Sequence, residues 1–253
     1  MYKIVIPSYK REKTIIKKTL NTLHRHNINP KLIYIFVANK DEYNKYKKII
    51  PTNLYYKIII GKEGLAQQRN FIINYFQEGE RILNIDDDID EIYQLQGKKL
   101  IPCTNLHQLI KLGFKLCKKY KTKLLGIYPV QNSFFMDNSL HVGLYYIVGC
   151  LFWNINTHDK SLKIKFSEKE DFYRSIIYYK KFGKLLRFDN ITIKTNYYTE
   201  KGGMQENRTE KRVTKYADYL VKKYPQYCTY NTARKKHTEI KFLRQKNNKK
   251  IKF

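Results

Sequence analysis

The first 95 residues alternate between short apolar runs and longer amphipathic segments. The apolar runs predict buried strands at residues 3–7, 32–38, 55–60 and 81–85. Between them, apolar residues at helical spacing predict helices at residues 14–23, 41–50 and 65–76. Strands that alternate with helices favour a parallel sheet covered by helices on both faces, so this pattern predicts an α/β fold.

Polar clusters follow three of these four strands. They lie at residues 7–11, 61–69 and 86–88, after the first, third and fourth strands. Parallel sheets bind their ligands at the carboxyl ends of the strands, where such clusters meet. Each cluster alone is a weak signal, but their convergence predicts one binding site at this edge of the sheet.

The pattern is less regular beyond residue 100. It predicts helices at residues 107–120, 171–182 and 211–224, and strands at residues 124–130, 141–153 and 187–194. Glycines 202 and 203, followed by Met204 and Gln205, are typical of a flexible loop that covers a donor substrate, or of a plain turn. No repeat or low-complexity linker divides the chain.

Three adjacent aspartates at the end of an apolar strand are electrostatically costly. Like charges this close raise one another's pKa unless a cation neutralises them. A divalent ion with hard oxygen ligands, Mg²⁺ or Mn²⁺, is the economical explanation. The alternative is an acidic turn or a helix start that also includes Asp90 and Glu91, where the helix dipole tolerates negative charge.

Three segments in this order resemble the GT-A nucleotide-sugar glycosyltransferases. Residues 4–11 (IVIPSYKR) look like the nucleotide-binding opening, residues 64–70 (GLAQQRN) look like a helix with an Arg-Asn edge, and residues 83–89 (LNIDDDI) look like the DXD motif. The resemblance implies a mixed, mostly parallel sheet flanked by helices. It implies a glycosyltransferase domain over residues 1–210, with a nucleotide-binding half (1–95) and an acceptor half (96–210). A basic helical extension would follow over residues 211–253.

The resemblance also implies a role for each matching residue. Asp86 and Asp88 would hold Mn²⁺ or Mg²⁺, which bridges the diphosphate of a UDP-sugar and stabilises the departing UDP. Arg69 would balance the diphosphate or the aspartates; the plainer reading is a surface arginine that pairs with an acid. The donor-binding residues would be Pro7, Ser8, Tyr9, Arg11, Gln67, Arg69, Asn70, Asp86 and Asp87.

A second acidic group lies about 80 residues after the aspartates, at the start of a predicted helix. Glu168, Glu170 and Asp171 are similar to the Glu-Asp element that supplies the base in inverting GT-A enzymes. Such a base takes the proton of the acceptor hydroxyl. Asp171 is the first candidate and Glu170 the second. Ordinary negative charge at a helix N-terminus is the alternative.

The chain carries 50 Lys or Arg residues against 22 Asp or Glu residues, a net charge of +28. A field of this sign attracts polyanions, nucleic acid first among them, although a merely basic, solvated surface is the alternative. Residues 211–253 alone hold fourteen basic and two acidic residues. They are typical of a tail that contacts phosphates, or of a solvated terminus.

The aspartate triplet, the small size and the basic tail resemble the TET-associated viral and phage glycosyltransferases. This resemblance implies that the acceptor is 5-hydroxymethylcytosine in DNA. The alternatives are transfer to a glycan, lipid or protein, a nucleotidyltransferase or metal nuclease, and a non-catalytic nucleic-acid-binding domain with a vestigial sugar-nucleotide pocket. Base flipping is not required, because the C5 substituent projects into the major groove; few dedicated wedge residues are therefore expected.

The remaining features concern the compartment. The apolar runs are shorter than the roughly 18 residues that span a membrane. The four cysteines lack CxxC spacing, which argues against a zinc ribbon or a disulfide scaffold and favours reduced thiols. We therefore expect a soluble, intracellular protein of viral or phage origin. The sequence leaves the sugar, the anomeric outcome and the oligomeric state open.

Overall fold

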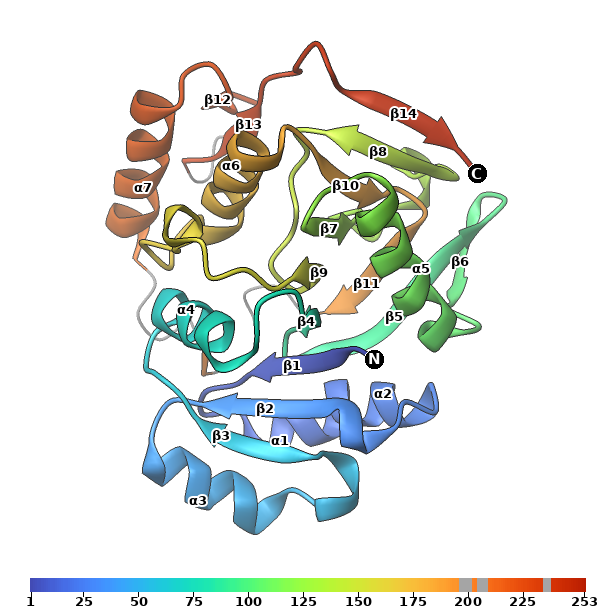
Figure 1. The fold of residues 1–253 in the computed structure, drawn as a ribbon, viewed down its shortest axis with the longest axis vertical. Helices are drawn as coiled ribbons and strands as arrows, with labels where there is room; N and C mark the ends of the chain where they lie inside the picture. Colours follow the sequence, from blue (N-terminus) through green and yellow to red (C-terminus); the bar gives the residue numbers. More distant parts are fainter. Residues whose placement is uncertain (196–201, 204–208, 234–237) are drawn as a thin grey trace.

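The central element is a nine-stranded mixed sheet (Figure 1). The computed structural model describes residues 1–195, 202–203, 209–233 and 238–253. The strand order is β14-β8-β10-β7-β9-β4-β1-β2-β3. The strands are β1 (Lys3–Pro7), β2 (Ile33–Val37), β3 (Lys57–Ile60), β4 (Arg81–Ile85), β7 (Leu124–Ile127), β8 (Ser139–Gly143), β9 (Leu151–Ile155), β10 (Leu185–Phe188) and β14 (Lys249–Lys252).

Strand directions in this sheet place most carboxyl ends at one edge. Strands β1, β2, β3 and β4 are parallel to one another. Strand β9 is antiparallel to both β4 and β7, so β7 runs in the same direction as β4, and β10 is parallel to β7. Strands β8 and β14 complete the other side in antiparallel pairs. The expected mixed, mostly parallel sheet is confirmed.

Helices cover both faces of the sheet, because successive apolar side chains of each strand point to opposite faces and each face must be buried. Ile4 and Leu83 point toward one core, which is closed by α1 (Glu12–Ile15), α2 (Asn21–Arg25), α3 (Lys40–Ile49) and α5 (Leu106–Lys119). Val5 and Phe152 belong to cores on the opposite face, where α4 (Leu65–Tyr75), α6 (Glu170–Phe182) and α7 (Glu210–Lys223) pack. A π-helical turn at Ile16–Leu20 joins α1 to α2.

Two small sheets accompany the large one. Strands β5 (Ile89–Gln96), β6 (Lys99–Pro102) and β11 (Ile191–Thr195) form the first, and β12 (Cys228–Tyr230) with β13 (Ile240–Phe242) forms the second. Asp90 and Glu91 therefore lie in strand β5 and not at a helix start. The buried residues Ile89, Ile92 and Leu95 are three positions apart, so burial does not follow the two-residue period of a regular strand, and the pairing with β11 shifts register between Lys194 and Thr195.

Two expected strands each divide into two. The run 141–153 holds the end of β8 and most of β9, which lie apart in the sheet with β10 and β7 between them. The run 187–194 holds the end of β10 and most of β11, which belong to different sheets. Apolar content extends through the first connection because that loop is itself buried, with Ile147 fully enclosed, so periodicity alone does not reveal the break. The second connection is only two polar residues, Asp189 and Asn190.

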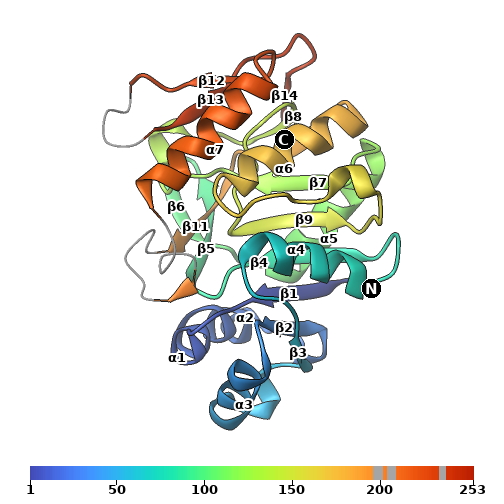
Figure 2. The ribbon, with the colours of Figure 1, turned by 90° about the vertical axis from the view of Figure 1, so that its left-hand side faces the viewer.

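The segment 211–253 was expected to be helical, and within its described residues α7 is the only helix. It continues into β12, β13 and β14, and β14 adds an edge strand to the main sheet by pairing with β8. Figure 2 shows α7 and β12–β13 at the opposite end of the molecule from α3. Pairing with β8 makes residues 249–252 a strand, because a four-residue segment with three lysines has low intrinsic β-propensity. Among the described residues, every helix is too short or too polar to cross a bilayer.

Candidate active site

A cavity of about 390 Å³ opens at the carboxyl ends of β1, β3 and β4. Most of its walls come from five separate stretches of sequence. They are the loop after β1, the loop and first turns of α4, the aspartates after β4, the buried loop 146–150, and the residues that begin α6. The C-terminal segment adds Arg212 and Glu239. The expected convergence of the three polar clusters at this sheet edge is therefore present in the structure.

The three aspartates lie in different environments although they are adjacent. Asp87 turns inward, is 4% exposed, and accepts hydrogen bonds from Ser8 Oγ at 2.5 Å and Arg11 Nη1 at 2.9 Å. The side chains of Asp86 and Asp88 are 37% and 14% exposed and pair with Arg69 at 3.1 Å and Arg11 at 3.2 Å. All three aspartates line the cavity, and the turn at Asp87 and Asp88 leaves Asp86 and Asp88 more accessible than Asp87.

Burial and mutual repulsion raise the pKa of two of these groups. Burial comes first and the neighbouring carboxylates add to it, which raises the pKa of Asp86 to about 7 and that of Asp87 to about 6, although Arg69 and Arg11 oppose both shifts. The two arginines therefore do not fully compensate the cluster. A divalent cation with oxygen ligands fits this donor set, because it would supply the missing positive charge at Asp86 and Asp88.

The helical segment below the aspartates fixes their backbone. Thr19 Oγ1 donates to the carbonyl of Asp86 at 2.7 Å and accepts from the amide of Ile89 at 2.9 Å, so one hydroxyl bridges both ends of the triplet. Thr22 donates to the carbonyls of Ile89 and Asp90. Thr19 lies within the π-helical turn. Such turns are frequent at functional sites, and this one directs Thr19 at the triplet.

The loop after β1 forms the wall beside the aspartates. Pro7, Ser8, Tyr9 and Arg11 all line the cavity, as expected for the nucleoside side. Gly202 and Gly203 pack directly on this loop, where the amide of Gly203 donates to the carbonyl of Tyr9 at 3.0 Å. Both have positive φ, and a Cβ at Gly202 would lie 2.7 Å from the carbonyl oxygen of Lys10, so glycine is required. Met204 and Gln205 lie outside the described residues.

Helix α4 presents a different polar edge from the one expected. Arg69 lines the cavity and also donates to Asn84 and to the carbonyl of Gly149. Gln67 and Asn70 do not line it. Asn70 instead donates its amide nitrogen to the carbonyl of Ile164 and accepts with its amide oxygen from the backbone amide of Ile164. Gln68 takes their place, because helical geometry puts it on the same side as Leu65 and Arg69. Consecutive residues of a helix point in different directions, so the run Gln67 to Asn70 cannot face the cavity as a whole.

The start of α6 separates the two candidates for the base. Glu170 is 4% exposed and forms a 2.7 Å ion pair with Arg174, which in turn donates to the carbonyl of Ile147. Asp171 lines the cavity and accepts hydrogen bonds from the hydroxyl of Tyr146 and from the amide of Phe172. Burial, followed by the charge of Glu170, raises the pKa of Asp171. Both acids line the cavity, but Glu170 is held in an internal ion pair, whereas Asp171 is bound by a hydroxyl and an amide.

Two buried arginines connect the two acidic groups. The guanidinium carbons of Arg69 and Arg174 lie 5.1 and 3.9 Å from the centroid of the Phe152 ring. One arginine is bound to Asp86 and the other to Glu170, and both hold carbonyls of the loop 146–150. The aspartates and the start of α6 are therefore fixed relative to one another through a common aromatic ring.

Several residues of the site could not be found from the sequence. Tyr146, Lys169, Arg212 and Glu239 all line the cavity, and the ammonium of Lys169 pairs with Glu239 at 2.7 Å. None of them belongs to a recognisable motif. Arg212 and Glu239 come from the segment that was expected to be a tail, and only its packing against α6, with Phe172 and Phe242 rings 5.1 Å apart, brings it here.

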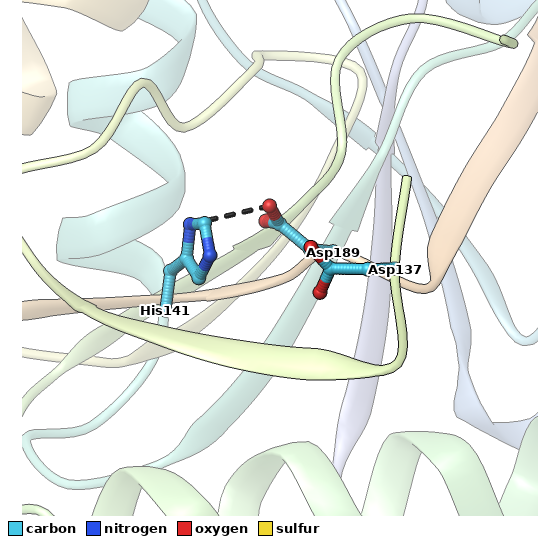
Figure 3. A group of neighbouring side chains, drawn as sticks. All are labelled: Asp137, His141 and Asp189. Atoms are coloured by element: carbon cyan, nitrogen blue, oxygen red, sulfur yellow. Dashed lines mark ion pairs between the residues drawn. The ribbon is translucent and has the colours of Figure 1, made fainter. Parts of the chain in front are cut away.

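A separate group, Asp137, His141 and Asp189, has ligand atoms within 4.8 Å of one another and could hold a metal ion (Figure 3). His141 Nδ1 lies 3.2 Å from Asp189, and Arg187 donates to both oxygens of that carboxylate. Asp137 pairs with Lys250. This group lies outside the lining of the 390 Å³ cavity, whereas the aspartate triplet is part of it, so the triplet is the better candidate for a divalent cation that contacts a substrate.

Comparisons with known proteins agree with this architecture. A family model described as TET-associated glycosyltransferase matches residues 2–203. No curated protein matches the sequence. The structure of S. aureus TarS 1–349 is similar, with a TM-score of 0.50 and 17% identity, over 76% of this chain and 59% of that chain. The present chain thus spans 59% of the length of that relative.

A second similar structure covers more of the chain. It is glucosyl-3-phosphoglycerate synthase from Mycobacterium tuberculosis in complex with Mn²⁺, UDP and glucosyl-3-phosphoglycerate. The TM-score is 0.52 at 9% identity, over 94% of this chain and 87% of that chain. At such identities the likeness shows the fold alone, a mixed central sheet flanked by helices.

Proposed function

The chain belongs to the TET-associated glycosyltransferase family, and we propose that it transfers a hexose from a UDP-sugar to 5-hydroxymethylcytosine in DNA. The observation that carries this proposal is the placement of Asp86, Asp88 and Asp171 around one cavity. The first two suit a metal-bound diphosphate, and the third suits an acceptor hydroxyl. The complex of the mycobacterial neighbour with Mn²⁺ and UDP supports a nucleotide-sugar donor.

On the donor side, Asp86 and Asp88 would hold Mn²⁺ or Mg²⁺, which when bound neutralises the charge of the diphosphate leaving group. Pro7, Ser8, Tyr9 and Arg11 form the nucleoside wall. Arg11 and Arg69 keep the carboxylates in place and add positive charge beside the phosphates. Asp87, through Ser8 and Arg11, ties the nucleoside wall to the metal-binding loop.

On the acceptor side, Asp171 accepts the proton of the hydroxymethyl group. The hydroxyl oxygen forms a bond to the anomeric carbon while the bond from that carbon to the phosphate oxygen breaks, and UDP leaves with the electron pair. One displacement of this kind inverts the anomeric carbon. Tyr146 orients Asp171 by donating its hydroxyl to one carboxylate oxygen, while the amide of Phe172 binds the other. The raised pKa of Asp171 brings it nearer the operating pH, which suits a general base.

The DNA acceptor is supported by charge and by the family. A net charge of +28 favours a polyanionic partner, and the C5 substituent of cytosine projects into the major groove. A hydroxymethyl group there could enter a cavity of this size without dismantling the duplex.

The test is to incubate the protein with Mn²⁺, several UDP-sugars and either hydroxymethylated or unmodified duplex DNA, followed by mass spectrometry of the digested nucleosides. We expect a mass increase of one hexose less one water on 5-hydroxymethyl-2′-deoxycytidine alone. Hydroxymethylated DNA that stays unchanged, while an oligosaccharide, lipid or protein acceptor gains a hexose, would refute the DNA acceptor. Asp171→Asn should abolish transfer but keep UDP binding.

A further inference from the structure

The loop that follows β7 exposes two adjacent aromatic side chains. Phe134 and Phe135 are 84% and 62% exposed, and their rings lie edge to face with centroids 5.0 Å apart. Val130, on the same loop, is 47% exposed. Fully exposed phenylalanines are costly in water, and an apolar group of this kind on the surface commonly marks a site of interaction.

The loop holds this pair in a defined position. A short 3-10 turn, Ser133–Phe135, carries both rings, and the side chain of Asn132 caps it by accepting from the amide of Phe134 at 3.0 Å. Met136 is buried directly after them, and the amide of Asp137 donates to the carbonyl of Asp189. The ion pairs of Asp137 and Asp189 therefore support the base of the loop.

Topology places this loop at the edge of the sheet that holds the active site. Strand β7 runs in the same direction as β4, with β9 between them, so residues after Ile127 emerge on the same side as residues after Ile85. Strands in a sheet are roughly 4.8 Å apart, which puts the ends of β7 and β4 about 10 Å apart. A DNA duplex is wide enough to contact both.

Basic side chains lie beside the aromatic pair. Edge strand β14 pairs Lys252 with Ser139, and the amide of Phe253 donates to the carbonyl of Asn138, so this strand adjoins the end of the loop. Lys249, Lys250 and Lys252 are all exposed. Apolar wedges flanked by lysines are the combination that inserts into or packs against a nucleic acid while gripping its phosphates.

We propose that loop 129–136 and strand β14 form a DNA-docking surface, in which Phe134 and Phe135 contact base steps of the duplex and Lys252 contacts its phosphates. This inference rests on the proposed DNA acceptor and names where on the protein the duplex lies. It also changes the expectation that the chain has few wedge residues, because two of its phenylalanines occupy the position of a wedge.

The experiment measures binding of the 253-residue protein to fluorescent, unmodified duplex DNA over a range of salt concentrations. The double variant Phe134→Ser, Phe135→Ser should bind roughly tenfold more weakly with an unchanged salt slope, because stacking contacts release few counterions. Lys252→Gln should reduce the slope of log affinity against log salt by about 1. Tyr56→Ser is the matched control, because Tyr56 is also exposed (52%). It precedes β3, which is the outermost strand on the side of the sheet opposite β14.

Thermal unfolding and UDP binding of each variant show that the fold and donor site are intact. If the double variant binds DNA with wild-type affinity, the inference is overturned. If the double variant keeps its DNA binding but loses binding to phosphatidylserine vesicles, the surface belongs to a membrane contact instead. A shift from dimer to monomer on sedimentation, with DNA binding retained, would assign it to a second copy of the chain. These binding assays need no sugar transfer. If the wild-type protein binds hydroxymethylated DNA but adds no hexose to it, the result counts against the proposed function and leaves the docking surface untouched.

Discussion

At the scale of single residues, the site depends on how neighbouring carboxylates are separated. Asp87 is bound by Ser8 and Arg11, and Glu170 is bound by Arg174. All of these acids line the cavity, but Asp87 and Glu170 are buried, whereas Asp88 and Asp171 are only partly buried. The chemistry that we propose is thus carried by the more accessible acids, and their buried neighbours fix the local backbone.

Asp88→Asn tests the metal site. The substitution removes an anionic ligand but keeps its size, so thermal stabilisation by UDP with Mn²⁺ should require about 10- to 100-fold more ligand, a loss typical of damaged metal sites. Differential scanning fluorimetry with and without Mn²⁺ measures this. Asp90→Asn is the control, since Asp90 lies two residues away and outside the cavity lining. Equal Mn²⁺-dependent stabilisation of the Asp88 variant and the wild type would remove Asp88 from the site.

Tyr146→Phe tests the positioning of the base. The Tyr146 hydroxyl lowers the pKa of Asp171 by donating to its carboxylate, so its removal should raise that pKa further. A base works only when deprotonated, so the fall in activity toward acid should begin at a higher pH, with roughly threefold to tenfold lower kcat near pH 6 and a smaller loss near pH 8. A pH profile of kcat measures this, with Tyr145→Phe as control. If the acid side of the kcat profile does not shift, either the hydrogen bond from Tyr146 to Asp171 or the role of Asp171 as the base is wrong.

At the scale of elements, helix–sheet packing holds the central strands in place. Gly113 of α5 faces Trp153 of β9, and a Cβ on Gly113 would lie 2.4 Å from the indole nitrogen. That nitrogen donates to the carbonyl of Ile110 at 3.0 Å, so the ring cannot move away without losing a buried hydrogen bond. Strand β9 pairs with β4, which carries the aspartates.

Gly113→Ala should therefore destabilise the protein although alanine favours helices. Overpacking of a filled core costs about 1–3 kcal/mol, which exceeds the roughly 1 kcal/mol gained in helix propensity. For a chain of this size we expect a Tm lower by about 2–6 °C in thermal unfolding. Leu112→Ala, next to it and 42% exposed, should change Tm little. A Tm for Gly113→Ala at or above the wild-type value would show that the ring can yield.

At the scale of the whole molecule, net charge governs encounters with DNA. Counterion release should make binding to unmodified duplex fall steeply as salt rises, by about 1000-fold or more between 50 and 200 mM if six or more phosphates are contacted. Fluorescence anisotropy titrations at several salt concentrations provide the slope. Affinity that does not change with salt would contradict an electrostatic role for the +28 charge.

The sequence by itself determined the α/β alternation of the first 95 residues, the strand ends where polar residues collect, and the aspartates at the end of β4. These features are local, because periodicity of 2 or 3.6 residues is written in neighbouring positions. Only the tertiary structure decided that Gln68 replaces Gln67 at the cavity, that Glu170 is bound to Arg174, and that Tyr146, Arg212 and Glu239 join the site. It also decided that 249–252 is a sheet strand. Such outcomes depend on contacts between residues far apart in the chain, and no local pattern encodes them.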